Sequence, residues 1–153
     1  MSVLNPWYIT GFCDGEAAFT YSRASGSFAL YFGIKQRADN RQLVDGIREF
    51  FDYIGTIYYP AEPKDGLKSE SSQGAIYYRV TKAAELKRIV EHFDKYPLQS
   101  PKKKKLYLIW RQMVKYKLDN FRNTDYTVLE GLAEEMSKLN SKSRNFKAHK
   151  KLN

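Results

Sequence analysis

Alternation of apolar and polar residues predicts four strands. Large apolar side chains stand at every second position of the segment 27–37, which is the period of a half-buried strand: Phe28, Leu30, Phe32 and Ile34. Shorter alternating segments at 16–23, 56–59 and 75–81 predict three further strands. The turn residues of 24–27 and the Pro-, Gly- and Ser-containing segment 60–74 are predicted to be connections.

Helical spacing of apolar residues fills the rest of the chain. Asn5 followed by Pro6 is a typical helix start and predicts a first helix that ends near Asp14. Apolar stripes predict helices around 43–51 and 86–93, and two more helices are expected over 101–118 and 124–140. The predicted class is therefore α+β, with four strands and with the helices gathered on one face of the sheet.

Composition limits the classes of protein to which the chain can belong. Its 153 residues suit one domain, and 42% hydrophobic and 15% aromatic residues suffice for a core. The single Cys13 excludes a disulfide scaffold and a cysteine-based zinc cage. No apolar run has the length of a membrane span, and the first residues lack the pattern of a secretory signal, so neither a membrane nor a signal peptide is expected.

The charge of the chain favours a polyanionic partner. Lys and Arg number 26 against 17 Asp and Glu, a formal net charge of +9. For a small, aromatic-rich basic domain, nucleic acid is the leading partner class, ahead of an anionic membrane surface. No acidic residue follows Glu135, so a basic tail is expected from about residue 141; a solvated, frayed tail is the alternative.

The strand period also defines a polar sheet face opposite the apolar one. A face rich in hydroxyl, tyrosine, lysine and arginine side chains suits a nucleic-acid groove, although an ordinary solvated face has the same composition. The residues that we expect to contact nucleic acid are Thr20, Ser22, Arg23, Ser27, Tyr31, Lys35, Arg37, Tyr58, Tyr77 and Arg79.

The segment 9–17, Ile-Thr-Gly-Phe-Cys-Asp-Gly-Glu-Ala, has two unusual features. Gly11 and Gly15 lie four residues apart in or near a helix, where each costs roughly 1 kcal/mol relative to Ala, and they would permit close approach of a second helix. No other segment of this chain resembles this helix, so a two-fold pairing of two copies is predicted. The expected interface residues are Trp7, Thr10, Gly11, Asp14 and Gly15.

The second feature is a carboxylate at the end of that helix. Glu16 adds negative charge where the helix dipole and the exposed carbonyls are already negative. A divalent cation would relieve this, and carboxylate with carbonyl oxygens suits Mg²⁺. An exposed glutamate in a turn is the simpler alternative.

The same segment resembles the LAGLIDADG motif of homing endonucleases, with Gly11, Phe12, Asp14 and Glu16 in place and Ile9 and Thr10 as substitutions. The resemblance extends through Gly33–Arg37 and Gly55–Tyr58 to Tyr78–Thr81 and Tyr96–Leu98. It implies an αββαββα fold with a four-stranded, saddle-shaped, DNA-binding sheet, here followed by two extra helices in a single domain over 1–153.

The resemblance also implies roles for individual residues. Glu16 takes the place of the metal-binding acid, and Ala17, where the family usually has Gly, would offer its backbone carbonyl to the metal. Gln36 matches a polar residue near the attacking water. Lys102 best matches a lysine near the scissile phosphate, with the register among Lys102–Lys105 left open. Asp14 matches a position that does not bind the metal.

The implied function is a metal-dependent, sequence-specific double-strand DNA endonuclease. With one motif, the chain would act as a homodimer on a long pseudo-palindromic site, unless it is half of a two-motif protein. The alternatives are an intron RNA maturase, a non-catalytic DNA-binding regulator, or a basic RNA-binding structural protein. Family members of this kind are often encoded in organellar introns, which implies a mitochondrion or another organelle. His92 and Cys13 are predicted to be packing residues, and His149 lies in the tail.

Overall fold

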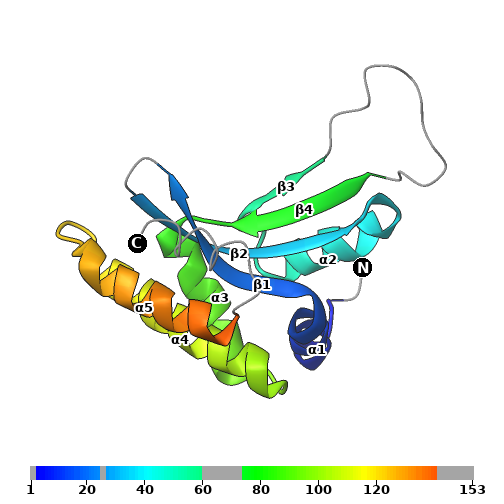
Figure 1. Ribbon diagram of the computed structural model, residues 1–153. Coiled ribbons are helices and arrows are strands. Elements are labelled where there is room, and N and C mark those ends of the chain that lie inside the picture. Colours follow the sequence, from blue (N-terminus) through cyan, green and yellow to red (C-terminus); the bar gives the residue numbers. More distant parts are fainter. Residues whose placement is uncertain (1–2, 25–26, 60–73, 141–153) are drawn as a thin grey trace.

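The computed structural model describes residues 3–24, 27–59 and 74–140. Its four strands form one antiparallel sheet in the order β1-β2-β4-β3 (Figure 1). The elements, in chain order, are α1 (Pro6–Glu16), β1 (Ala17–Ala24), β2 (Ser27–Arg37), a 3-10 turn (Ala38–Asn40), α2 (Arg41–Phe50), β3 (Thr56–Tyr58), β4 (Ala75–Val80), α3 (Ala83–Lys95), α4 (Pro101–Asp119) and α5 (Tyr126–Leu139). The predicted α+β class and the αββαββα order with two further helices are confirmed. The predicted loop 60–74 lies almost entirely outside the described residues, as do the basic tail and His149.

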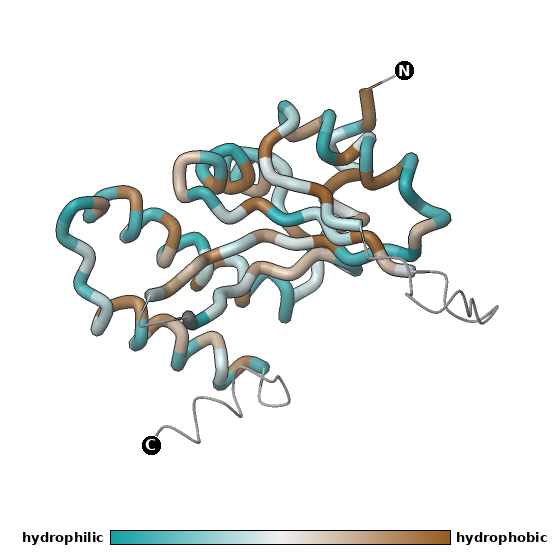
Figure 2. Tube along the Cα trace, turned by 90° about the horizontal axis from the view of Figure 1, so that it is seen from above, coloured by the Kyte–Doolittle hydropathy of each residue, from teal (hydrophilic) through white to brown (hydrophobic). Residues whose placement is uncertain are grey.

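The five α-helices of the described residues pack on one face of the sheet, which gives a two-layer architecture (Figure 1). The residues predicted from the strand period face this layer: Phe28, Leu30, Phe32 and Ile34 are each at most 5% exposed. Phe19 joins them and contacts the rings of Phe32, Phe93, Tyr107 and Trp110. Seen from above, hydrophobic and hydrophilic residues alternate along both the strands and the helices (Figure 2). This is expected of a two-layer fold, because each element turns one side toward the single core.

A buried polar contact anchors α1 to α3. The Thr10 hydroxyl, 1% exposed, donates to the Tyr96 carbonyl at 2.8 Å, and its oxygen lies 3.0 Å from His92 Nε2. A hydroxyl has one proton, so His92 Nε2 must be the donor in the second contact. Burial, with a contribution from Arg88, lowers the pKa of His92 from 6.5 to about 4. His92 is therefore a neutral packing residue, as predicted, and Cys13 is likewise fully buried.

The connection from α2 to β3 requires glycine at one position. Gly55 has a φ of +73°, and a Cβ there would collide with the Arg79 carbonyl of β4. The Gly55 amide donates to Glu85 of α3 at 3.0 Å, and Arg48 donates to the Gly55 carbonyl at 3.2 Å. These contacts tie the start of β3 to α2 and α3, where Gly55 passes close to the strand that carries Arg79.

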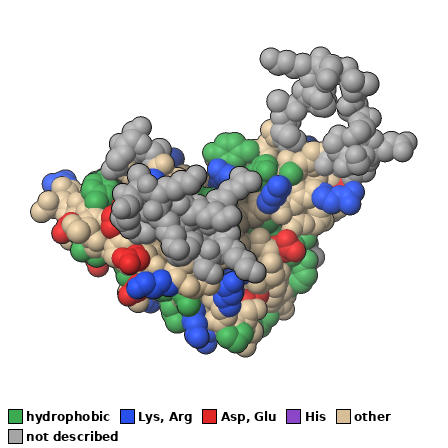
Figure 3. All heavy atoms as spheres, in the orientation of Figure 1, with side chains coloured by type: hydrophobic (Ala, Val, Ile, Leu, Met, Phe, Trp, Pro, Cys, Tyr) green, Lys and Arg blue, Asp and Glu red, His purple; other side chains and the backbone are tan. Residues whose placement is uncertain are grey.

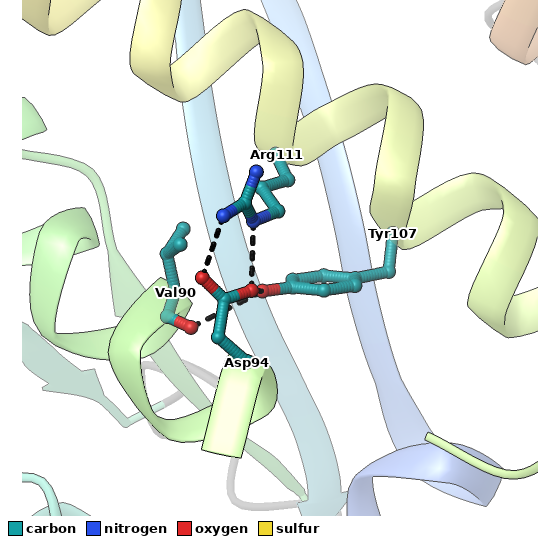
Figure 4. A network of polar contacts seen from close by, with 4 residues as sticks. All are labelled: Val90, Asp94, Tyr107 and Arg111. Atoms are coloured by element: carbon teal, nitrogen blue, oxygen red, sulfur yellow. Dashed lines mark hydrogen bonds and ion pairs between the residues drawn. The ribbon is translucent and has the colours of Figure 1, made fainter. Parts of the chain in front are cut away.

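Ion pairs connect the elements of the helical layer. Arg111 of α4 binds Asp94 of α3 through two hydrogen bonds of 2.7 and 2.8 Å, and Tyr107 donates to the same carboxylate at 3.0 Å (Figure 4). Burial alone would raise the pKa of Asp94, but the hydrogen bonds from Arg111 and Tyr107 outweigh it and lower that pKa. On the face seen in Figure 3, acidic and basic side chains lie side by side over the helices.

Among the helices of the described residues, none combines the length and the apolar character that crossing a membrane demands.

Candidate active site and nucleic-acid interface

The end of α1 brings an acid and an amide together. Glu16, the last residue of α1, is exposed where the chain turns into β1. The Gln36 side chain of β2 donates to a Glu16 carboxylate oxygen at 3.3 Å. Asn40 donates in turn to the Gln36 amide oxygen at 2.9 Å, which fixes the orientation of that amide. The structure thus places Glu16 and Gln36, 20 residues apart in sequence, at one site.

The adjacent carbonyl belongs to Ala17, whose side chain is buried at the start of β1. The Lys103 ammonium of α4 donates a hydrogen bond to this carbonyl. Burial lowers the pKa of Lys103, against the opposing influence of Asp14, Cys13 and Glu16. Lys102, the residue preferred from the sequence, is exposed on α4. The lysine that the fold brings to the site is therefore Lys103, because the register of α4 turns Lys102 away from β1.

Asp14 sets that register. Its Oδ2 atom accepts hydrogen bonds from the backbone amides of Gln99 at 3.0 Å and Ser100 at 2.8 Å, immediately before α4 begins. Free amides at a helix start need such an acceptor, and a carboxylate is favourable there. Asp14 therefore joins the last turn of α1 to the start of α4 within one chain.

The outward face of α1 differs from the predicted interface in two residues. Thr10 is buried against His92 and cannot contribute to a surface, and Asp14 is engaged with α4. Gly11 and Gly15 are exposed, and a Cβ on either would meet no described atom within 4 Å. Trp7 and Tyr8, 52% and 47% exposed, complete this face. Within the described residues, therefore, no contact requires glycine at either position.

The donor set at the α1–β1 junction suits a hard divalent cation. It consists of the Glu16 carboxylate and the Ala17 carbonyl, and a positive charge, the Lys103 ammonium, already lies at that carbonyl. In the described part of the chain, no three His, Cys, Asp or Glu residues cluster to hold a metal ion. One chain thus offers only part of a coordination shell, to which Glu16 would contribute its carboxylate and Ala17 its backbone carbonyl.

Cationic and aromatic side chains share the centre of the open sheet face. The Arg79 guanidinium lies over the rings of Tyr31 at 5.1 Å and Tyr77 at 5.6 Å, and the Lys35 ammonium lies 5.5 Å from the Tyr77 ring. These four residues belong to β2 and β4, whose register pairs Lys35 with Tyr77 and Gly33 with Arg79. The Tyr31 ring also lies over Gly33, where a Cβ would make an ordinary van der Waals contact with it at 3.5 Å.

The other predicted contact residues, Arg23 excepted, follow the same alternation. Thr20, Ser22 and Ser27 lie on β1 and β2, opposite Tyr31, Ala29 and Ala24. Tyr58 pairs with Tyr77 across β3 and β4 and is 51% exposed. Arg37 is exposed near the end of β2 and lies 3.4 Å from Asp39.

Arg23 corrects the predicted contact set. Its guanidinium binds Glu130 of α5 at 2.8 Å and lies over the rings of Tyr21 and Phe28. Along β1 it shares the parity of Phe19 and Tyr21, so it faces the helices and not the open face. The alternation that placed Phe19 and Tyr21 inside already carried this signal.

A shallow hollow joins the two parts of the site. It has a volume of about 160 Å³, and its lining includes Glu16, Tyr31, Lys35, Tyr77 and Arg79. A second hollow beside it is lined by Glu16, Lys35, Gln36, Arg37 and Ala75. The acid at the α1–β1 junction therefore opens directly onto the cationic sheet face.

Comparison with known proteins decides the family. Residues 9–114 match the sequence model of the family described as LAGLIDADG endonuclease. The chain belongs to the LAGLIDADG endonuclease family. The match starts at Ile9 in α1 and ends at Val114 in α4, and so contains the whole sheet, Glu16, Gln36 and Lys103.

Relatives within the family include larger fungal proteins. The chain is 31% identical over 139 residues to the probable intron-encoded endonuclease 2 of Neurospora crassa, covering 86% of this chain and 27% of that protein. It is 27% identical over 106 residues to the probable intron-encoded endonuclease Cox1-I1b of Schizosaccharomyces pombe, covering 66% and 25%. The chain spans about a quarter of the length of these relatives.

Solved structures of other proteins share the fold of this chain. The LAGLIDADG meganuclease I-AabMI, bound to uncleaved DNA, superposes with a TM-score of 0.74 at 26% identity, over 95% of this chain and 48% of that chain. The homing endonuclease I-TnaI superposes with a TM-score of 0.75 at 22% identity, over 99% and 100% of the two chains. The fold therefore occurs both as part of a longer chain and as a chain of its own length.

Three residues that the sequence did not single out lie at the site or on the outward face of α1 in this LAGLIDADG chain. Lys103 is one of four consecutive lysines, so the sequence gives no reason to prefer it. Asn40 was seen only as a possible helix cap, whereas it holds Gln36. Tyr8 lies on the outward face of α1, stacked on Phe12 with ring centroids 6.4 Å apart, and its helical spacing from Gly11 and Gly15 was an available signal.

Proposed function

We propose that the chain is a metal-dependent, sequence-specific homing endonuclease that hydrolyses both strands of double-stranded DNA at a long pseudo-palindromic site. The observation that carries this is the position of Glu16, the acid of the family motif, in a hollow shared with Lys35 and Arg79. A duplex lying on the open sheet face would bring a phosphate to this acid. The proposed unit is a single endonuclease domain over 1–153.

The chemistry is assigned to four groups of the chain. Glu16 and the Ala17 carbonyl would hold Mg²⁺ or another divalent cation, which would supply positive charge at the scissile phosphate and activation of water. Gln36, oriented by Asn40, hydrogen-bonds Glu16 and the attacking water. Lys103, in place of Lys102, offers a positive charge to the scissile phosphate.

Cutting both strands requires a second site of the same kind, and we propose that a second copy of the chain supplies it. The exposed Gly11 and Gly15, with Trp7 and Tyr8 beside them, permit α1 of one copy to pack closely on α1 of another. Gly11→Leu should therefore convert the dimer to a monomer. Sedimentation equilibrium measures the mass of both proteins; a wild-type monomer would instead favour a longer two-motif protein of which this is one half.

The names of the relatives support a proposal for the genetic origin of the chain and for its cellular compartment. Both fungal proteins are described as intron-encoded, and we propose the same origin for this chain, with a mitochondrion or another organelle as its compartment. Binding to intron RNA is an additional role compatible with the basic face.

The decisive experiment separates cleavage from binding. A target is first selected from a randomised duplex library by binding to the full chain. Glu16→Gln keeps the shape of the side chain and removes its charge, so it should eliminate Mg²⁺-dependent cleavage while DNA affinity is retained. Glu91→Gln, an exposed glutamate of α3, removes the same charge away from the site and should cleave normally. Wild-type cleavage by Glu16→Gln would refute the catalytic assignment.

A further inference from the structure

One cation of the chain lies where the proposed metal would bind. The Lys103 ammonium donates to the Ala17 carbonyl, and Asp14 and Glu16 are among its electrostatic neighbours. Lys103 is half-buried, whereas Lys102, Lys104 and Lys105 around it are exposed. Of these four lysines, Lys103 alone is directed to the metal-binding oxygen atoms.

The position of the Lys103 ammonium has a local electrostatic cost. Lys103 lies in the first turn of α4, where the helix dipole disfavours a positive charge. The compensating groups are the Ala17 carbonyl and the carboxylates of Asp14 and Glu16. Asp14 also fixes the start of α4 through the Gln99 and Ser100 amides, so the same residue positions the helix and attracts its lysine.

We propose that Lys103 holds the Ala17 carbonyl while no divalent cation is bound, and that cation binding displaces its ammonium toward the DNA phosphates. This inference rests on the proposed endonuclease function. A divalent cation and an ammonium on the same carbonyl oxygen would repel each other strongly, so the two compete for it. The lysine side chain is long and flexible enough to leave without movement of α4.

The competition has a consequence for the order of events. In the free protein, Lys103 weakens metal binding; when DNA lies on the sheet, its phosphates offer the displaced ammonium a new partner. DNA and metal should then bind with positive coupling, and each should tighten the other by the same factor. Lys103 would thereby keep the free protein poorly loaded with metal until DNA has bound.

The test is a titration of the full chain with Mn²⁺ in the absence of DNA, with free Mn²⁺ measured by electron paramagnetic resonance. Lys103→Met should bind Mn²⁺ at least about fivefold more tightly than the wild-type protein. Lys102→Met removes the same charge one residue away and should bind like the wild type. Lys103→Gln serves as a second neutral variant and should also bind more tightly.

Equal binding by wild type, Lys103→Met and Lys103→Gln, including no detectable binding by any of them, would overturn the proposal. So would equal tightening by Lys102→Met, since the effect would then be one of net charge. Glu16→Gln in the same titration tests the metal site separately from the competition between Lys103 and the cation. If it abolishes Mn²⁺ binding while Lys103→Met changes nothing, the metal site stands and only the competition falls.

Discussion

The cations of the helical side and those of the open sheet face have different partners. On the helical side, Arg23, Arg88 and Arg111 bind carboxylates from other parts of the chain at 2.7–2.8 Å. On the open face, Arg79 and Lys35 lie over tyrosine rings, and neither has a carboxylate within salt-bridge distance among the residues that the structure describes.

This difference separates cations that stabilise the fold from cations that are available to a partner. A guanidinium bound by a carboxylate already has one or two of its donors engaged within the fold. A guanidinium stacked on a ring is held in place by cation–π attraction while its N–H groups still point outward. Arg37, beside the exposed Asp39, is an intermediate case at the edge of the open face.

The largest predicted effect concerns the helical side in acid. Burial lowers the pKa of His92 in the folded protein to about 4, below its ordinary value of 6.5. The unfolded chain therefore binds a proton that the folded chain resists, and stability is lost as the pH falls from 6.5 toward 4. We expect this histidine to contribute a decrease of about 3 kcal/mol in the free energy of unfolding over that range. Urea unfolding at a series of pH values measures it.

A matched variant isolates the contribution of His92. Gln has an Nε2 donor that can reach Thr10, but it does not titrate. His92→Gln should unfold more easily at pH 7, since it loses ring contacts with Phe50, Phe51 and Phe93. Its stability should then fall less steeply between pH 6.5 and 4 than that of the wild type. Parallel pH profiles would mean that other groups cause the acid sensitivity.

The sheet and the Thr10–His92 contact illustrate what the sequence can and cannot reveal. The period-2 patterns of segments 27–37 and 75–81 predict the sheet, its buried face and thus Lys35 and Arg79 on the open one, because side-chain direction in a strand is fixed by parity. The burial of Thr10 depends on His92, 82 residues away, and no local pattern encodes it.

The same distinction applies to the candidate site. Glu16 follows from the motif, whereas the choice between Lys102 and Lys103 depends on where α4 begins. The carboxylate that fixes that start, Asp14, is 86 residues from Ser100. A run of four lysines contains no signal that could replace this long-range contact. The inward direction of Arg23, by contrast, could have been predicted from the sequence, because Arg23 shares the strand parity that places Phe19 and Tyr21 in the core.

The next effect tests the open face. Arg79→Ala should weaken binding to the selected DNA target by about 1–3 kcal/mol, roughly 5- to 150-fold, if the guanidinium makes a bidentate contact with a guanine. Because Arg79 is exposed, the free energy of unfolding should change little. Fluorescence anisotropy with the selected target and its single-base variants measures the affinity. An equal loss on every sequence would identify Arg79 as a phosphate contact instead.

A smaller effect of the opposite kind is expected on the helical side. Arg111→Ala leaves Asp94 without its bidentate partner and should lower the free energy of unfolding by about 1–2 kcal/mol. The loss is limited because both side chains keep contact with solvent, 28% and 39% exposed, which screens the pair. DNA affinity, measured on the same target as for Arg79→Ala, should be unchanged. A loss of affinity would show that the two sides are not separable.

The smallest effect distinguishes a phosphate contact from a base contact on the open face. Lys35 presents a point charge beside Tyr77, so we expect it to bind phosphate without reading sequence. Lys35→Ala should weaken binding several-fold on all duplexes alike and reduce the slope of log affinity against log salt by about 0.9. Lys138→Ala, an exposed lysine of α5 that lies 4.0 Å from Glu134, removes the same charge on the helical side and should leave the slope unchanged. If both variants reduced the slope equally, the salt dependence would report net charge, and the open face would lose its distinction from the helical side.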